Sequence, residues 1–324
     1  MLKVAIVSGG YSSEYDVSIQ SGETVYNNLD KAKYDTYQII VNPDNWLLKR
    51  DNGDEIALNK QDFTVLINDE LLTFDYVFIA IHGDPGETGV FQEYLDGLNI
   101  PYSTCGASIS KLTFDKEACK DHLKDTEVRL ATSVLIAKGD EVNQEEVLQK
   151  VGLPCFVKPN NGGSSCGISK VKEAGDLQEA LDLGFTEDDE VMVEQFIDGK
   201  EITCGVYQSG GVVKSLGVTE IITENEFFDY EAKYTAGKAE EITPADVPPE
   251  VSAECERLSL FMYEHLNCRG LCRFDFIVQD GELYYLEVNT VPGLSPVSIV
   301  PKQAEYTGIS LGELFSKVIE ETCG

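Results

Sequence analysis

The chain has 324 residues, and 25 Lys and Arg against 57 Asp and Glu give a formal net charge of −32. Apolar residues make up 42% and charged residues 25%, which is typical of globular proteins and excludes a chain that is disordered throughout. Because so negative a chain repels phosphate backbones and contains no run of about 18 apolar residues, we expect neither a nucleic-acid partner nor a membrane span.

Residues 1–104 carry the pattern of a doubly wound α/β unit. An apolar, β-rich run ends at Ser8-Gly9-Gly10 and a helical pattern follows, which is how a doubly wound parallel sheet opens. A later strand is followed by His82-Gly83, where the ligand loops of a parallel sheet lie. Strands are predicted at residues 3–7, 37–41, 76–81 and 100–102, and helices up to Leu29 and at residues 91–98.

Residues 105–192 alternate shorter helical and strand patterns. The loop from Pro159 to Gly167 is rich in glycine and serine and joins two strand patterns, so we predict a hairpin with a glycine-rich tip. Helices are predicted at residues 111–123, 144–151 and 177–183, and strands at residues 134–137, 156–158, 168–171 and 190–196.

Residues 193–324 combine long alternating runs with two helical patterns. The stretch from Glu224 to Glu241 is polar and aromatic, and we interpret it as a long functional loop. Residues 292–301 are expected to be irregular. Strands are predicted at residues 201–208 and 212–223, a hairpin at 272–279 and 282–288, and helices at 249–266 and 311–321. The fold class is therefore α/β followed by α+β, in three domains at residues 1–104, 105–192 and 193–324.

Nine cysteines are scattered along the chain without a CxxC pair. This pattern favours reduced thiols over a disulfide framework or a zinc site, and the first ten residues do not resemble a signal peptide. We therefore expect a cytoplasmic protein in which the cysteines act as small apolar residues.

The strongest group of chemically active residues is divided between the two strands of the last predicted hairpin. Arg273 and Asp275 are two positions apart on one strand, and Glu287 and Asn289 are two apart on the next, so each pair projects from one face. Carboxylate and amide oxygens suit Mg²⁺, and the guanidinium would stabilise negative charge that develops during a reaction. A solvated charged face is the weaker interpretation, because apolar residues alternate with these four.

Two further positions carry weaker signals. Lys158 precedes the glycine-rich loop, whose backbone N–H groups could surround phosphate oxygens, although a simple turn explains the glycines equally well. His82 follows a strand of the parallel sheet, where either a structural or a functional role fits. The Gly9-Gly10 turn lacks the third glycine of a dinucleotide fingerprint, which disfavours a nicotinamide enzyme.

Taken together, the motifs resemble those of the D-alanine:D-alanine ligases of the ATP-grasp superfamily. The resemblance covers essentially the whole chain, and its motifs occur in the same order with compatible spacings. They are Gly9-Gly10-Tyr11-Ser12-Ser13-Glu14, His82-Gly83, Asp115-Lys116, Lys158-Pro159, Gly163-Ser164-Ser165-Cys166-Gly167, Tyr230-Glu231-Ala232-Lys233-Tyr234, Arg273-Phe274-Asp275 and Glu287-Val288-Asn289-Thr290-Val291-Pro292-Gly293.

The resemblance implies an ATP-grasp fold and an ATP-dependent ligation of two D-alanine molecules. ATP would phosphorylate the carboxylate of the first D-alanine, and the amine of the second would attack the acylphosphate to give D-alanyl-D-alanine for peptidoglycan. The resemblance further implies two Mg²⁺ ions, with Mn²⁺ as a substitute, and a homodimer.

The same resemblance implies which residues contact the amino-acid substrates. Glu14 would hold the ammonium group of the first D-alanine, and His82 would lie near the second. Ser298 would bind the carboxylate of the second substrate. Arg273 and the backbone N–H of Gly293 would stabilise the tetrahedral oxyanion.

Nucleotide and metal contacts also follow from the resemblance. Lys116, Lys158 and Lys233 would contact the phosphates of ATP, and Glu194 and Glu201 would flank the adenosine. The implied metal ligands are Asp275, Glu287 and Asn289, and the implied network that orients the loop over the site is Ser164, Tyr234 and Glu14.

Two alternatives stay open. A related ligase could join D-alanine to D-lactate or D-serine, although Tyr234 favours the dipeptide ligase because the resembling depsipeptide ligases usually lack this tyrosine. A non-catalytic nucleotide-binding protein on the same fold would be expected to have lost one of Arg273, Asp275, Glu287 and Asn289, and all four are present.

Overall fold

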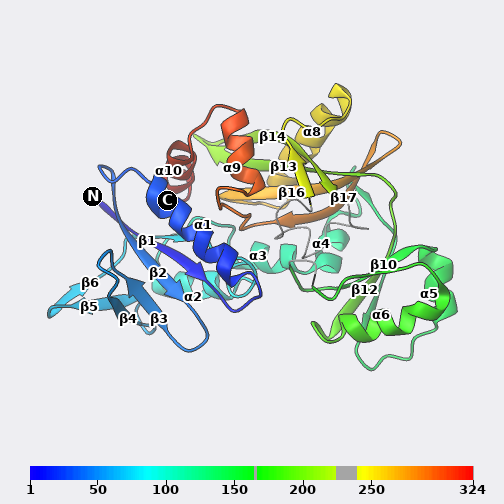
Figure 1. Cartoon of the computed structure of the whole chain (residues 1–324), viewed down its shortest axis with the longest axis horizontal. Helices are drawn as coiled ribbons and strands as arrows, with labels where there is room; N and C mark the ends of the chain where they lie inside the picture. The colour runs from blue at the N-terminus through cyan, green and yellow to red at the C-terminus, as the bar shows by residue number, and fades with distance from the viewer. Residues whose placement is uncertain (164–165, 224–238, 324) are drawn as a thin grey trace.

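The computed structural model describes residues 1–163, 166–223 and 239–323, which form three sheets with helices packed against them (Figure 1). In Figure 1 the N-terminal sheet lies at the left, the second sheet at the lower right and the third above the centre. None of the helices in these ranges is both long and apolar enough to cross a bilayer.

The N-terminal sheet is built around β1 (Leu2–Gly9), which runs parallel to β2 (Tyr34–Val41) on one side and to β7 (Tyr76–Ile79) on the other. This parallel part agrees with the sequence analysis. Beyond β2 the sheet continues as an antiparallel series that the sequence analysis missed, because β4 buries one residue and β6 none, which leaves little apolar pattern. The added strands are β3 (Trp46–Lys49), β4 (Glu55–Asn59), β5 (Thr64–Ile67) and β6 (Glu70–Leu72).

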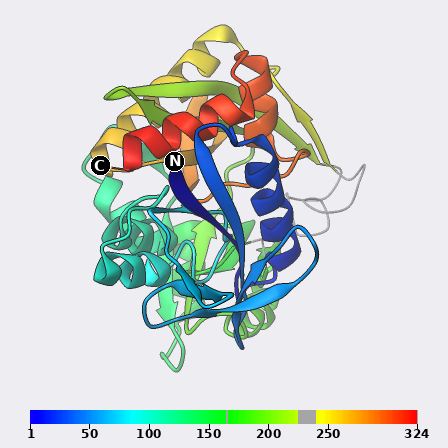
Figure 2. The same ribbon diagram turned by 90° about the vertical axis from the view of Figure 1, so that its left-hand side faces the viewer.

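Both faces of this sheet are covered by helices. Val4 and Ile6 of β1 pack in one apolar core with residues of α1 and α10, whereas Ala5 and Val7 pack in another with Phe91 of α2. Figure 2 shows α10 lying across the sheet beside α1, so the last helix of the chain completes the core of the first sheet. The bounds are α1 (Tyr15–Asn28), α2 (Val90–Leu98) and α10 (Leu311–Thr322).

The second sheet is a small antiparallel one in the order β11-β10-β12-β9. Two short helices pack with it around a core that includes Val157, Leu181 and Val193. The elements are β9 (Ser133–Ala137), α5 (Gln144–Val151), β10 (Cys155–Pro159), β11 (Ser169–Val171), a 3₁₀ turn at Ala174–Asp176, α6 (Leu177–Gly184) and β12 (Glu190–Gln195).

The third sheet has six strands in the order β15-β14-β13-β16-β17-β8, all antiparallel to their neighbours except β8, which runs parallel to β17. Its core contains Phe274 and Phe276 from the sheet, Met262 from α8 and Leu123 from α4. The elements are β8 (Arg129–Leu130), β13 (Lys200–Ser209), β14 (Val212–Thr223), β15 (Ala239–Ile242), α8 (Pro249–His265), β16 (Leu271–Gln279), β17 (Glu282–Asn289) and α9 (Ile299–Tyr306).

Three element predictions need correction. The helix predicted at 111–123 is two helices, α3 (Ala107–Phe114) and α4 (Lys116–Leu123), because Asp115 leaves the helical conformation and its side chain caps α4 by accepting from the Ala118 N–H at 2.9 Å. The end of the predicted 224–241 loop is strand β15, and residues 224–238 lie outside the described residues. Helix α9 begins at Ile299, within the stretch expected to be irregular.

Candidate active site

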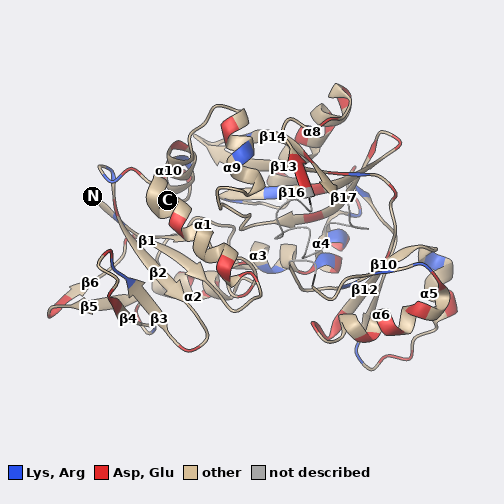
Figure 3. Ribbon diagram, viewed as in Figure 1, with Lys and Arg blue, Asp and Glu red and all other residues tan. Residues whose placement is uncertain are grey.

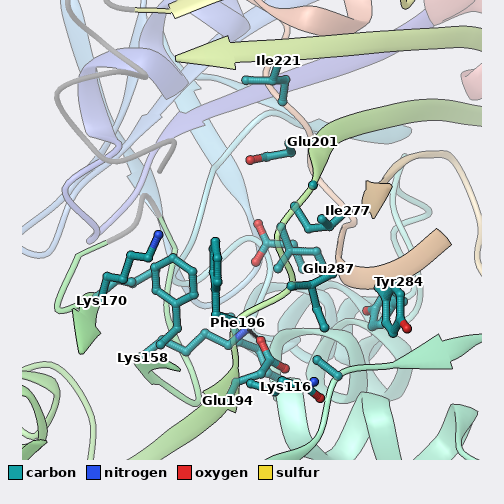
Figure 4. A pocket seen from close by; sticks show the side chains of 18 of the residues that line it. Lys116, Lys158, Lys170, Glu194, Phe196, Glu201, Ile221, Ile277, Tyr284 and Glu287 are labelled. Carbon is teal, nitrogen blue, oxygen red and sulfur yellow. Dashed lines mark hydrogen bonds and ion pairs between the residues drawn. The ribbon is translucent and has the colours of Figure 1, made fainter. Parts of the chain in front are cut away.

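The second and third sheets face each other across a cleft with a volume of about 460 Å³. Strands β10 and β12 line one wall, and β13, β14, β16 and β17 contribute residues to the other (Figure 4). The connection from β12 to β13, residues 196–199, also lines the cleft, so a single short segment joins the two walls. Although the chain is strongly acidic, Figure 3 shows basic residues on α4 and β16 in the middle of the molecule.

The β16–β17 hairpin brings four polar residues together, and one of them, Glu287, reaches this cleft. Its register pairs Arg273 with Asn289 and Asp275 with Glu287, which is the juxtaposition expected from their spacing. A register shift directly after Asp275 marks a local irregularity in the ladder. Glu287 lines the cleft and, with Glu201 of β13, appears on one side of it in Figure 4.

Asp275 is the centre of a dense hydrogen-bond network. Arg273 donates to both carboxylate oxygens, from Nε at 2.9 Å and from Nη2 at 2.7 Å, and the Thr203 hydroxyl donates to one of them. The amide nitrogen of Asn289 donates to Asp275 at 3.0 Å, so the amide oxygen remains as its acceptor. Burial would lower the pKa of Arg273, but Asp275, Glu287 and Glu201 raise it above the ordinary value, and the guanidinium stays charged.

A second charged group is buried on the opposite wall. Glu194 of β12 accepts from Lys158 of β10 and from Lys120 of α4, each at 2.6 Å, and Lys120 also donates to the Ala131 carbonyl at 2.8 Å. Burial would raise the pKa of Glu194, but the two ammonium groups outweigh it and hold the pKa below its ordinary value. Figure 4 shows Lys158, Glu194 and Lys116 together at the base of the view.

The glycine-rich loop connects this wall to the N-terminal unit. Lys116, the first residue of α4, donates to the Gly162 carbonyl at 2.7 Å. A Cβ placed on Gly163 would come within 3.0 Å of the Glu14 carboxylate, and the Cys166 thiol lies 3.6 Å from the Ser13 hydroxyl. The loop therefore approaches Glu14, the residue that precedes α1.

His82 belongs to a buried chain of hydrogen bonds that reaches the loop after β17. Its Nδ1 lies 2.7 Å from the Val291 carbonyl, its Nε2 lies 2.8 Å from the Ser21 hydroxyl, and Ser21 accepts from the Leu294 N–H at 3.0 Å. Because the Val291 carbonyl can only accept, Nδ1 carries the proton and Nε2 accepts from Ser21. Burial lowers the pKa of His82, which is consistent with this neutral tautomer.

Glu87 holds the same loop from the other side. One carboxylate oxygen accepts from the Val291 N–H at 3.0 Å and the other from the Gly83 N–H at 2.8 Å. Burial, reinforced by the charge of Glu14, raises the pKa of Glu87 to about 8. His82 and Glu87 thus fix the carbonyl and the N–H of one residue, Val291, two positions before Gly293.

Gly293 and Ser298 lie at opposite ends of the turn that leads into α9. A Cβ placed on Gly293 would come within 2.8 Å of the Ser298 hydroxyl. Ser298 is the N-cap of α9 and its hydroxyl lies 2.8 Å from that of Ser295, so the two serine hydroxyls lie at the N-terminal end of a helix. Such an end attracts carboxylates through its free N–H groups.

Three predicted site residues, Ser164, Lys233 and Tyr234, lie outside the described residues. Three others were missed by the sequence analysis: Lys120, Ser21 and Glu87. Lys120 lies four residues after Lys116, a spacing that places both on one face of α4 and could have identified it. Ser21 and Glu87 act through partners more than 200 positions away, and no local signal marks them.

Comparisons with known proteins agree with this architecture. A family model described as the D-ala D-ala ligase N-terminus matches residues 3–105, and one described as the D-ala D-ala ligase C-terminus matches residues 123–320. The chain is 46% identical over 320 residues to a D-alanine–D-alanine ligase of Flavobacterium johnsoniae, covering 99% of each chain. It is 45% identical to the ligase of that name from Christiangramia forsetii, covering 98% of this chain and 97% of the relative.

Solved structures show the same likeness. The D-alanine–D-alanine ligase from Bacillus anthracis complexed with ATP is 32% identical, with a TM-score of 0.80 over 99% of this chain and 97% of that one. The VanG D-Ala:D-Ser ligase from Enterococcus faecalis is 29% identical, with a TM-score of 0.87 over 98% of each chain. With both family models matched in order and close relatives spanning its full length, the chain belongs to the D-alanine–D-alanine ligase family and has the ATP-grasp fold.

Proposed function

We propose that the protein joins two D-alanine molecules into D-alanyl-D-alanine with ATP, through an acylphosphate, for the synthesis of peptidoglycan precursors. The observation that carries this proposal is the β16–β17 hairpin, which groups two carboxylates, an amide and a guanidinium and places one of the carboxylates, Glu287, in the cleft between the sheets. This combination suits a reaction that concentrates the negative charge of ATP and a substrate carboxylate at one place.

ATP would occupy the cleft between the second and third sheets. Lys158 and Lys116 would contact its phosphates, and Glu194 and Glu201 would lie beside the adenosine. The ion pairs of Glu194 with Lys158 and Lys120 support this assignment, because they hold both ammonium groups in place before the nucleotide arrives. Lys233 would be a further phosphate contact.

The donor set of the hairpin fits Mg²⁺. Asp275, Glu287 and Asn289 offer two carboxylates and an amide oxygen, which are the hard ligands that this ion prefers. Two such ions, or Mn²⁺ in their place, would neutralise the phosphate oxygens when bound. Arg273 holds Asp275 in a bidentate contact and thereby fixes the direction in which its carboxylate faces.

The amino-acid substrates would lie between the hairpin and the N-terminal unit. Glu14 would pair with the ammonium group of the first D-alanine, and Ser298 at the N-terminus of α9 would bind the carboxylate of the second, with His82 nearby. Arg273 and the N–H of Gly293 would stabilise the oxyanion of the tetrahedral intermediate. The contacts of His82 and Glu87 with Val291 support this role, because they fix the backbone two residues before Gly293. Ser164, Tyr234 and Glu14 would orient the covering loop.

Three further proposals concern the domains of the chain, its oligomeric state and its location in the cell. We propose domains at residues 1–104, 105–192 and 193–324, a homodimer, and a cytoplasmic location. Equilibrium sedimentation of the full chain tests the dimer directly.

Phosphate release from ATP, measured with a panel of D- and L-amino acids and D-lactate, tests the proposed reaction. We expect release to require D-alanine and to match dipeptide formation one to one. Release that never depends on a D-amino acid would contradict the proposal. An Asp275→Asn variant serves as the inactive control for contaminating phosphatases.

Joining D-alanine to D-serine is the second candidate, because the fold matches the VanG D-Ala:D-Ser ligase as well as it matches the dipeptide ligases. D-serine and D-lactate are therefore supplied together with D-alanine in the same assay. A mixed product that exceeds D-alanyl-D-alanine at equal concentrations would favour this candidate.

A further inference from the structure

Three buried thiols meet where the N-terminal unit joins the third sheet. Cys105 follows the N-terminal unit, and Cys268 and Cys272 flank the turn between α8 and β16, yet all three sulfurs lie within 4.8 Å of one another. Cys105 and Cys272 are fully buried and Cys268 is 5% exposed. Within the described part of the chain, no other group of three or more His, Cys, Asp or Glu residues has its ligand atoms this close together.

The spacing of the sulfurs matches a thiolate site for a soft cation. A Zn–S bond of about 2.3 Å places two thiolates of a tetrahedral site roughly 3.8 Å apart. The Cys105 and Cys272 sulfurs are 3.7 Å apart. No backbone movement is therefore needed for these two to share an ion, and the third sulfur lies close enough to complete a triangle.

The surroundings favour a negative charge on one of the sulfurs, that of Cys105, whereas the contact with Cys105 raises the pKa of Cys268 and burial raises the pKa of Cys272. The backbone N–H of Arg269 donates to the Cys105 sulfur at 3.3 Å, and the Arg269 side chain lies over the Tyr102 ring nearby. Hydrogen bonds from Cys268 and Cys272 lower the pKa of Cys105 below that of an ordinary thiol, against the opposing effect of burial. Such N–H donors and a nearby cation are the outer partners that stabilise metal thiolates.

We propose that Cys105, Cys268 and Cys272 form a site for one soft d¹⁰ cation of the Zn²⁺ class, separate from the oxygen ligands of the hairpin. Binding of a divalent ion replaces three S–H protons by three metal–sulfur bonds, so three protons leave and the site carries one net negative charge. Arg269 offsets that charge. A fourth position is left for water or an added thiol.

The site would anchor the start of the strand that carries the hairpin residues. Cys272 directly precedes Arg273 on β16, and a Cβ on Gly270 would come within 1.9 Å of the Ser103 carbonyl, so the two segments already touch. A cation shared by Cys105 and Cys272 would fasten the N-terminal unit to β16. We therefore expect binding to raise the unfolding temperature.

Cd²⁺ is the probe for this site, because Cd²⁺ bound to thiolates has a charge-transfer absorption that Cd²⁺ bound to carboxylates lacks. Reduced full-length protein is titrated with Cd²⁺ in the absence of oxygen, and also refolded in its presence because the sulfurs are buried. We expect one ion per chain, displaced by Zn²⁺, and at least about tenfold weaker binding in Cys105→Ala and Cys272→Ala. Cys155→Ala, an equally buried thiol in the second sheet, and the more exposed Cys166→Ala are the matched controls and should keep the absorption.

Alkylation of wild-type protein keeps the test decisive if a variant fails to fold. Mass spectrometry after brief unfolding in alkylating reagent should show Cys105, Cys268 and Cys272 protected together by Cd²⁺, with Cys155 unprotected. The proposal would be overturned if neither folded nor refolded protein showed the absorption. It would also be overturned if the absorption and the protection did not depend on these three residues, and the thiols would then be packing residues only.

Discussion

Replacing Lys120 by Met tests whether the buried charges around Glu194 act as one unit. The substitution keeps the length of the side chain but removes one of the two ammonium groups that lie 2.6 Å from Glu194. It also leaves the Ala131 carbonyl, 2.8 Å from Lys120 Nζ, without this donor. Losing one partner of a buried ion pair costs about 3–5 kcal/mol, and because Lys158 remains, we expect the lower end, about 3 kcal/mol, in the free energy of unfolding.

Urea unfolding at neutral pH measures this loss, and a double-mutant cycle identifies its source. Glu194→Gln should also destabilise, because it leaves two buried ammonium groups without their carboxylate. The loss of unfolding free energy in the double variant should be smaller than the sum of the two single losses, by at least about 1 kcal/mol. Lys138→Met is the control, because its ion pair with Asp189 is largely exposed and should contribute less than about 1 kcal/mol. Additive losses, or a Lys120→Met protein as stable as wild type, would refute the reasoning.

Three further substitutions probe the hairpin and the loop after it. Glu287→Gln should lower turnover by far more than tenfold with unchanged circular dichroism, because it removes one of two carboxylates at the proposed metal site; a loss within tenfold, about 1.4 kcal/mol, would mean that the metal is held elsewhere. His82→Gln should flatten the pH dependence of stability. Burial holds the His82 pKa below the unfolded value of about 6.5, so wild type should lose up to about 1.4 kcal/mol per pH unit as the pH falls below that value, and equal urea-unfolding slopes in the two proteins would exclude this. At about pH 9, where the Glu87 carboxyl is ionised because its pKa is about 8, Glu87→Gln should cost about 1–3 kcal/mol of unfolding free energy, since its NH₂ group would face a backbone N–H donor; unchanged stability would show that the carboxylate does not hold Val291.

The hairpin was predictable from sequence because its information is local. Arg273 and Asp275, like Glu287 and Asn289, share a face by the two-residue period of a strand. Their pairing across the hairpin also needs the register shift after Asp275, because the two-residue turn alone would place Asp275 opposite Leu286. Strands β4 and β6 were not predictable, because mostly exposed strands in the outer, antiparallel part of the sheet carry little apolar alternation. The break at Asp115 follows from the capping preference of aspartate, a signal that was present in the sequence and overlooked.

The loop contacts and the thiol cluster could not be predicted for a different reason. Ser21 and Leu294 are 273 positions apart, and Cys105 and Cys272 are 167 apart. Nothing in the neighbourhood of either residue indicates its partner, because such contacts depend on how the three sheets pack together. The scattered cysteines were therefore interpreted as apolar packing residues, whereas three of them converge.

The packing of α10 on the N-terminal sheet has a consequence for synthesis of the chain. Tyr76 of β7 contacts Thr322 of α10 across 246 positions, and Phe315 belongs to the same core as Ile6. A ribosome-bound chain that already contains β1, β2 and β7 therefore exposes one apolar face of that sheet until α10 has emerged. Domains usually fold in the order in which they are synthesised, but here the first sheet must wait for the last helix. We expect a chaperone at the ribosome to bind nascent chains that lack residues 311–322, and to dissociate once these residues have emerged from the ribosome.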